Sequence, residues 1–395
     1  MQCEVDNKNR NNKQSYQIYN KTLSEPDEAT LIVNPAPKPI RLLIVDDSRL
    51  IRTAIRKIFD LDAQVKIVGE AANGNEALAI IPKLKPDVIT LDINMPKMDG
   101  LLTLKHIMIK HPTATVMVSS LTKEGATKTF DALRFGAIDF IAKPSQLEGK
   151  GFKTQQQNIL EKIKLAAAVQ MENIRLSRTR INAPTNNNST QTEIDRCVVF
   201  GASEGGYGAM LKIIPRLKPD LPAAYIGIIY AAPAYVDAFA NYLNRHSVIN
   251  VKRAIEGITL QSGTCYLATG YEYITAVKMN KKLALRVHPS PFPERRGTIN
   301  ILMLSLSEIM SNKTMGVILS GQDQDGAEGV AEIARVGGDV IIQSPQTCLF
   351  KEMAQTAIRM CNSGKIVADI NIANAIEDYF NKTLKREDDS HVEKS

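Results

Sequence analysis

Short apolar segments alternate with helical stretches in two separate parts of this 395-residue chain, and this alternation most constrains the fold. Strands that alternate with helices form parallel βαβ units, and several such units build a doubly wound sheet. The predicted strands of the first part are Arg41–Val45, Val65–Gly69, Val88–Leu91, Thr115–Val118 and Asp139–Ala142. A second series opens at Cys197–Phe200. The sequence therefore predicts an α/β protein with two doubly wound parallel-sheet domains.

Composition marks the ends of these domains. The first residues are rich in Asn, Lys and Gln and end in a proline-rich stretch, which predicts a disordered extension. Residues 155–178 contain no Gly or Pro and predict a helix, and the Asn-rich stretch after them predicts a polar linker. The predicted parts are an extension (1–38), a first domain (39–160), a helix and polar linker (161–195), a second domain (196–383) and a disordered tail (384–395).

Composition also excludes several classes of protein. The formal net charge is +7, but basic and acidic residues are interleaved, so a solvated surface is favoured over nucleic-acid binding. The five cysteines are far apart and form no C-x-x-C motif, which fits a reducing compartment. The first residues lack an apolar signal core, and the apolar stretch from Tyr225 to Val236 is too short to cross a bilayer. We expect a cytoplasmic protein without membrane insertion.

Acidic and polar residues follow four strands of the first domain. Asp46 and Asp47 follow the first predicted strand and Asp92 the third, while Ser119 and Ser120 follow the fourth and Lys143 follows the fifth. Because ligands bind beyond the carboxyl ends of the strands in such sheets, we expect these side chains to converge. Three carboxylates create a site of hard oxygen ligands that suits Mg²⁺. A lysine and a serine hydroxyl can bind phosphoryl oxygens, which is what phosphoryl transfer requires.

These residues carry a resemblance to a known family. Val45-Asp46-Asp47-Ser48, Leu91 to Pro96, Met98-Asp99-Gly100, Val118-Ser119-Ser120 and Ala142-Lys143-Pro144 together resemble response-regulator receivers, which have a flavodoxin-like fold. The resemblance implies that Asp92 accepts a phosphoryl group from a histidine kinase. It implies that Asp46, Asp47, Asp92 and the backbone carbonyl of Asn94 hold Mg²⁺. It also implies that Ser119 and Lys143 sense the phosphorylated state and that Phe140 is the switch aromatic.

The second domain opens with a different motif. The predicted strand Cys197–Phe200 leads into Gly201-Ala202-Ser203-Glu204-Gly205, and a helical stretch follows. This G-x-S-x-G arrangement between a strand and a helix is typical of a nucleophile elbow. The alternative is a glycine-rich turn whose serine caps the helix, and a single motif leaves that alternative open.

More of the second domain resembles one family of esterases. Gly201 to Gly206, Val251 to Gly257, Gly263 to Ala268, Gly316 to Gly321, Asp325 to Gly329 and Arg335 to Gly338 resemble the catalytic domain of chemotaxis protein-glutamate methylesterases of the CheB type, a Rossmann-like domain. That family also places a receiver in front. Its members use a Ser, His, Asp triad, in which Ser203 matches the nucleophile and Asp325 the acid.

The triad histidine has no match. Where the family has an apolar-His-Met-Pro segment, this chain has Ile229 to Pro233, so Ala231 is assigned to the place of the imidazole. Glu204 stands where the family has a small polar residue. A serine hydroxyl needs a base to remove its proton, and alanine cannot serve as one. His288 is the one candidate for a substitute base.

Two functions remain open at this stage. One is a phosphorylation-regulated esterase that removes methyl groups from the glutamates of a methyl-accepting chemoreceptor or similar signalling protein. The other is a non-catalytic phospho-switch or binding module derived from the same family. The receiver resemblance supports control by phosphorylation in both cases, and the missing histidine favours the second.

Overall fold

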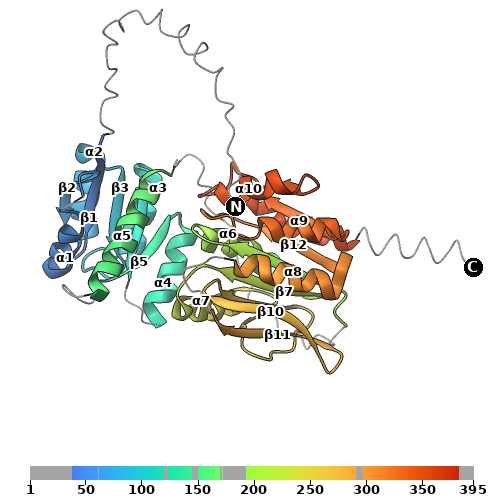
Figure 1. The fold of residues 1–395 in the computed structure, drawn as a ribbon. Coiled ribbons are helices and arrows are strands. Elements are labelled where there is room, and N and C mark those ends of the chain that lie inside the picture. The colour runs from blue at the N-terminus through green and yellow to red at the C-terminus, as the bar shows by residue number, and fades with distance from the viewer. Residues whose placement is uncertain are drawn as a thin grey trace, which may run out of the picture. The chain divides into compact units, whose positions relative to one another are not determined.

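The computed structural model describes residues 38–60, 62–119, 123–144, 150–169, 171, 193–290 and 297–381. The predicted polar linker and C-terminal tail, and nearly all of the predicted N-terminal extension, lie outside these residues. Two parallel α/β sheets account for most of the described chain (Figure 1).

The first sheet has five parallel strands in the order β2-β1-β3-β4-β5. Its strands are β1 (Ile40–Val45), β2 (Val65–Ala71), β3 (Val88–Asp92), β4 (Ala114–Ser119) and β5 (Asp139–Ala142). All five agree closely with the predicted strands. Chain order reverses between β1 and β3, which places a crevice beyond the carboxyl ends of these two strands.

Five helices cover the two faces of this sheet. The core residues of α1 (Arg49–Phe59) and α5 (Lys150–Ala167) pack on one face. Those of α2 (Gly74–Leu84), α3 (Gly100–Lys110) and α4 (Lys123–Arg134) pack on the other. Ser48 caps α1, as its place before the helix predicts: its hydroxyl accepts a hydrogen bond from Ile51 N.

Helix α5 differs from the helix predicted for residues 155–178. It begins at Lys150 and ends at Ala167, so it continues past residue 160, where the first domain was predicted to end. Ile163 and Ala166 on this continuation are buried in the same core as the strands of the first sheet. The sequence has no Gly or Pro near Ala167 to mark the end, and packing on the sheet determines the length of the helix.

The second sheet has seven parallel strands in the order β14-β13-β12-β6-β7-β9-β8. They are β6 (Arg196–Ala202), β7 (Ala223–Ile229), β8 (Asn250–Arg253), β9 (Thr264–Thr269), β12 (Thr314–Ile318), β13 (Asp339–Gln343) and β14 (Lys365–Val367). Here chain order reverses at β6, which lies between β12 and β7. Both predicted parallel sheets are thus confirmed.

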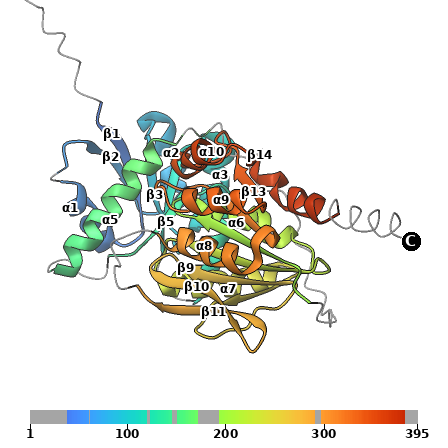
Figure 2. The same ribbon diagram turned by 45° about the vertical axis from the view of Figure 1, so that its right-hand side comes forward.

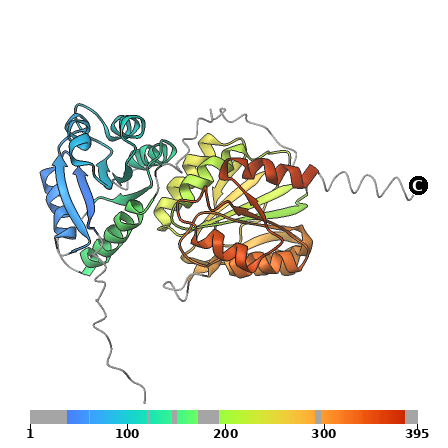
Figure 3. The same ribbon diagram turned by 90° about the horizontal axis from the view of Figure 1, so that it is seen from above.

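Helices again lie on both faces of the second sheet (Figure 3). The core residues of α6 (Gly206–Ile213), α7 (Pro233–His246) and a helical segment at 372–381 pack on one face. Those of α8 (Thr298–Met310), α9 (Ala327–Arg335) and α10 (Glu352–Met360) pack on the other, where α8 lies beside α9 (Figure 2). Short 3₁₀ turns occur at Ile214–Arg216, Ser311–Lys313 and Asp369–Asn371.

An antiparallel hairpin was not predicted. Strands β10 (Glu272–Met279) and β11 (Lys282–Pro289) pair with each other, and β10 packs against α8. Their turn places Asn280 and Lys281 at φ of 50° and 65°, the left-handed region in which glycine would be the usual signal. Asn280 suits this region, but Lys281 stands where the usual Asn-Gly pair has its glycine, so the hairpin was not predicted.

None of the described helices is long and apolar enough to span a bilayer.

Helix α4 packs against α7 as well as against its own sheet. Phe130 of α4 lies with its ring centroid 4.9 Å from that of Phe239 and 5.3 Å from that of Tyr242. The hydroxyl of Tyr242 donates a 2.6 Å hydrogen bond to Asp131 Oδ1. The packed aromatic rings and the hydrogen bond to the Asp131 carboxylate both stabilise the contact between α4 and α7.

We predict that Tyr242→Phe lowers the stability of the full chain by roughly 1–2 kcal/mol, because it removes a hydrogen bond to a carboxylate. Thermal or urea denaturation measures the change.

Tyr225→Phe is the matched control. Tyr225 is equally buried, but its hydroxyl has no hydrogen-bond partner among the described residues, so its removal should cost nothing or stabilise slightly. Equal losses in both variants would show that the Tyr242–Asp131 bond contributes nothing of its own.

Candidate functional site

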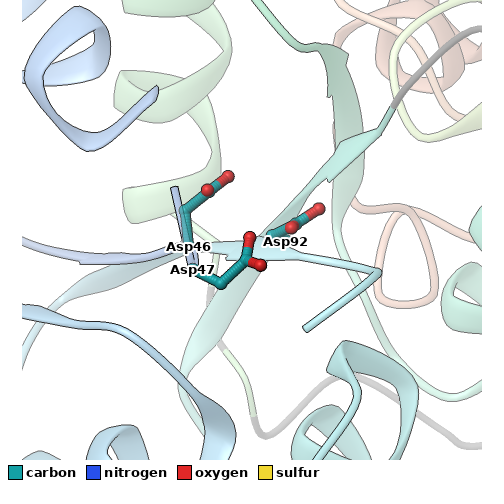
Figure 4. Close-up of side chains that lie close together, drawn as sticks. All are labelled: Asp46, Asp47 and Asp92. Atoms are coloured by element: carbon teal, nitrogen blue, oxygen red, sulfur yellow. The ribbon is translucent and has the colours of Figure 1, made fainter. Parts of the chain in front are cut away.

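Three carboxylates meet at the carboxyl end of the first sheet (Figure 4). Asp46 and Asp47 follow β1, and Asp92 is the last residue of β3. One oxygen from each lies within 4.8 Å of the others. Asp46 and Asp92 are almost completely buried, whereas Asp47 is exposed. The predicted convergence of these residues at one sheet edge is therefore observed.

Lys143 supplies the positive charge of this site. It follows β5, and its Nζ lies 2.9 Å from Asp92 Oδ2 and 3.3 Å from Asp46 Oδ2. Although burial alone would lower the pKa of Lys143, its bonds with the two carboxylates raise it, so the ammonium stays charged. One cation thus faces two buried carboxylates, and the site remains short of positive charge.

The pKa values of the two buried carboxyl groups, Asp46 and Asp92, reflect this shortage of positive charge. Burial raises the pKa of Asp46, and the charge of Asp92 raises it further. Burial also raises the pKa of Asp92, although Lys143 opposes the effect. Apart from their ion pairs with Lys143, both oxygens of Asp92 and Oδ2 of Asp46 have no hydrogen-bond partner among the described residues. Buried oxygens with unused lone pairs, beside a third carboxylate, fit a small hard cation such as Mg²⁺.

The other predicted receiver residues lie at the same edge or just inside it. Ser119 ends β4 and is buried, and Lys143 N donates to its backbone oxygen at 2.9 Å. Phe140 on β5 is also buried, with its ring centroid 5.3 Å from that of Tyr207 and 4.7 Å from that of Tyr235. The aromatic side chain predicted as a switch is thus in contact with residues of α6 and α7.

Ser203 lies at the carboxyl end of β6, in the predicted turn between strand and helix. Gly205 has φ of 77°, and a Cβ on it would lie 2.7 Å from Ser320 Oγ, so this position requires glycine. The Ser203 hydroxyl is buried; it accepts a hydrogen bond from Gln322 N (3.1 Å) and lies 3.4 Å from Met353 Sδ. The strand–turn–helix elbow is present, but the Ser203 hydroxyl is buried from solvent and already accepts a hydrogen bond.

Asp325, the predicted acid, lies in the loop after β12 at the first turn of α8. Its Oδ2 accepts hydrogen bonds from Ile299 N (2.8 Å) and Tyr230 Oη (2.6 Å). Its Oδ1 accepts from Asn300 N and Gly326 N, each at 2.9 Å. Burial raises the pKa of Asp325, and these hydrogen bonds work against that rise. Each oxygen therefore already accepts two hydrogen bonds.

Tyr230 is the residue that the sequence interpretation overlooked. It follows β7 directly, and its hydroxyl accepts hydrogen bonds from Gly297 N (2.9 Å) and Thr298 N (3.4 Å) while it donates to Asp325. Tyr230 and Asp325 together thus satisfy four consecutive amides at the start of α8. Burial, followed by the charge of Asp325, raises the pKa of Tyr230. Ala231, which was assigned to the place of the imidazole, accepts a hydrogen bond from Thr269 through its backbone oxygen.

No imidazole hydrogen-bonds to Ser203 among the described residues. His288 on β11 is half exposed, and its Nε2 lies 3.9 Å from Glu256 Oε2. His246 at the end of α7 contacts the backbone oxygen of Tyr242 through Nδ1 and stacks on the Tyr242 ring. The proposed substitute base, His288, is therefore paired with an acid of its own rather than with the serine.

Comparisons with known proteins assign a family to each of the two domains. Residues 42–149 match the family model of the response regulator receiver domain, and residues 198–376 match that of the CheB methylesterase. The chain belongs to the CheB family. A protein-glutamate methylesterase/protein-glutamine glutaminase of Pyrococcus horikoshii is 34% identical over 324 residues, which cover 81% of this chain and 88% of that protein.

Two further relatives extend the comparison. A protein-glutamate methylesterase/protein-glutamine glutaminase 2 of Carboxydothermus hydrogenoformans is 35% identical over 351 residues, which cover 85% of this chain and 98% of that protein. The crystal structure of the response regulator domain of Thermotoga maritima CheB shares 47% identity, covers 34% of this chain and 99% of its own, and has a TM-score of 0.31.

The acidic site generates a prediction about stability. A carboxyl group whose pKa is raised in the folded state stabilises the fold below its unfolded pKa, and this contribution is lost as the pH rises through the folded value. Ionised Asp46 thus costs stability at neutral pH in metal-free protein. Asp46→Asn should raise the unfolding temperature by a few degrees at pH 7 in chelator, and by less near pH 4.

The complementary measurement adds Mg²⁺. Mg²⁺ should raise the unfolding temperature of the wild type and have little effect on Asp46→Asn, because a ligand that binds only the folded state stabilises it. A variant that melts below the wild type in chelator would show that Lys143 requires both carboxylates.

Proposed function

We propose that the first domain is a phosphorylation switch in which Asp92 accepts a phosphoryl group from a histidine kinase. The carboxylates of Asp46, Asp47 and Asp92, with the backbone carbonyl of Asn94, hold Mg²⁺. Lys143 and Ser119 bind phosphoryl oxygens, and Phe140 senses the change. The observation that carries this proposal is the buried Asp92 carboxylate: its Oδ2 lies 2.9 Å from Lys143 Nζ, and its Oδ1 has no hydrogen-bond partner among the described residues.

The chemistry follows from charge. An incoming phosphoryl group brings negative charge to a buried edge that already holds three carboxylates, so transfer requires neutralisation. Bound Mg²⁺ would supply charge neutralisation and orient the phosphoryl oxygens. Lys143, 2.9 Å from Asp92, is placed to keep its charge beside the acceptor before and after transfer.

Incubation of the full chain with Mg²⁺ and a small acyl phosphodonor should therefore label it at one acyl phosphate that hydroxylamine removes. Asp92→Asn should abolish labelling, because an amide cannot form the mixed anhydride. Asp60→Asn, at an exposed aspartate that ends α1, should label as the wild type does. Undiminished labelling of Asp92→Asn in mass spectrometry would refute the assignment.

For the second domain we propose that ester hydrolysis is impaired and that the domain acts chiefly as a binding or regulatory module. The observation that carries this proposal is the Tyr230–Asp325 hydrogen bond of 2.6 Å. In the family triad the acid orients an imidazole. In this chain the acid holds a phenol, and both are used to cap α8.

A tyrosine in this position is a poor replacement for histidine. A general base must take a proton from the serine, and a neutral phenol with a raised pKa has little tendency to accept one. The burial of the Ser203 hydroxyl, close to Gln322 N and Met353 Sδ, supports the same proposal. Loss of a triad member typically costs on the order of 10⁴-fold or more in rate.

The second candidate is the family activity itself, the removal of methyl groups from glutamates of a methyl-accepting chemoreceptor. The intact strand–turn–helix elbow around Ser203 favours it. The names of the relatives also describe such enzymes. Both candidates share the same partner class, a signalling receptor, and differ in whether the second domain cleaves the ester.

We predict that the full chain, activated with Mg²⁺ and phosphodonor, releases methanol from methylated receptor no faster than Ser203→Ala does. Tyr230→His combined with Glu204→Thr should raise the rate above both, because it places an imidazole against Asp325 and removes a negative charge next to the serine. Ala231→His should do less, since Ala231 makes no described contact with Asp325.

One result would show that the second domain is an active esterase. Turnover by the unmodified chain that Ser203→Ala removes would show that another group serves as base. His288→Gln would then be the next variant to assay.

A further inference from the structure

Arg52 on α1 contacts the backbone of both acidic residues that follow β1. Its Nη1 donates a 2.8 Å hydrogen bond to the backbone oxygen of Asp46 and a 3.3 Å bond to that of Asp47. Both carbonyls lie beyond the end of the strand, whose last residue, Val45, pairs with β2 and with β3. One nitrogen of Arg52 therefore ties the segment that carries both acids to the start of the following helix.

The guanidinium of Arg52 is fixed from its other side by Glu70 on β2. Arg52 Nε donates to Glu70 Oε2 at 3.0 Å, and Arg56 Nε, one turn further along α1, donates to Glu70 Oε1 at 3.0 Å. Burial alone would raise the pKa of Glu70, but its bonds with Arg56 and Arg52 lower it, so the carboxylate is ionised at neutral pH. A planar guanidinium bonded to a charged acceptor is held in a defined orientation.

The position of Arg52 is unfavourable for the helix itself. Arg49 and Arg52 both lie at the start of α1, and the first turn contains no acidic residue. The positive end of the helix dipole lies there, so it disfavours cations. The hydrogen bonds to Glu70 and to the two backbone oxygens offset this cost. Arg52 is thus placed for its contacts with the strand ends and not for the stability of the helix.

We propose that Arg52 is a positioning residue for the metal site, which fixes the backbone of Asp46 and Asp47 so that both carboxylates are held for a divalent cation. The inference rests on the proposed Mg²⁺ site and goes beyond it, because it assigns a residue that supplies no ligand. Mg²⁺ demands near-ideal octahedral geometry. Residues that orient metal ligands typically change metal affinity roughly 10–100-fold when they are replaced.

The two acids depend on Arg52 to different degrees. Asp46 has two further contacts: its N donates to the backbone oxygen of Ala71 at 3.1 Å, and its Oδ1 accepts from Ser48 N at 2.8 Å. Asp47 is exposed, and its bond with Arg52 is the contact that links its backbone to α1 beyond the chain itself. Release of Arg52 should therefore disturb Asp47 more than Asp46.

The test compares the Mg²⁺ affinity of full-chain variants. Arg52→Lys keeps the positive charge, but an ammonium presents its donors from one point and cannot reproduce the contact with Glu70 on one side and the two carbonyls on the other. It should weaken Mg²⁺ binding about ten-fold. Arg56→Lys is the matched control, since Arg56 binds the same Glu70 from the next turn of the helix, and it should bind Mg²⁺ as the wild type does. Titration with MgCl₂ at constant ionic strength, followed by amide NMR signals, measures each dissociation constant.

Melting curves in chelator establish that both variants are folded and separate positioning from stability. The proposal is overturned if Arg52→Lys binds Mg²⁺ as tightly as the wild type, even where its unfolding temperature falls, because Arg52 would then only stabilise the fold. It is also overturned if Arg56→Lys weakens Mg²⁺ binding as much as Arg52→Lys does. Failure of the wild type to bind Mg²⁺, or undiminished binding by Asp46→Asn, would instead remove the proposed metal site.

Discussion

A carboxylate buried at the carboxyl end of a parallel strand must find positive charge or hydrogen-bond donors, and both domains are organised around this constraint. In the first domain the carboxylates of Asp46 and Asp92 have Lys143 as their cation, and several oxygens lack hydrogen-bond partners. In the second domain the carboxylate of Asp325 accepts from three backbone amides and from Tyr230. The same requirement thus has two different solutions.

The two solutions differ in what they can do chemically. The first site has unused lone pairs and a raised pKa on two acids, so it can gain free energy by binding a cation. In the second site four donors surround Asp325, and the Tyr230 hydroxyl both accepts and donates. A saturated network of this kind stabilises the start of α8.

Helix α4 contacts residues of both domains. Its Thr129 and Lys128 hydrogen-bond to Ser119 and Asn94 near the acceptor. Its Phe130 and Asp131 contact α7. Helix α7 in turn begins three residues after Tyr230. Any change in the position of α4 is therefore opposed by packing in both domains.

The sequence by itself determined both parallel sheets, the five strands of the first, and the convergence of Asp46, Asp92 and Lys143, because strand ends share one edge whatever the details of packing. It also determined the elbow at Ser203. Tertiary structure alone decided that α5 stops at Ala167, that β10 and β11 form a hairpin, and that Tyr230 meets Asp325. These features depend on burial and on contacts between residues far apart in the chain; the tyrosine and the aspartate are 95 positions apart, and no local pattern records such a contact.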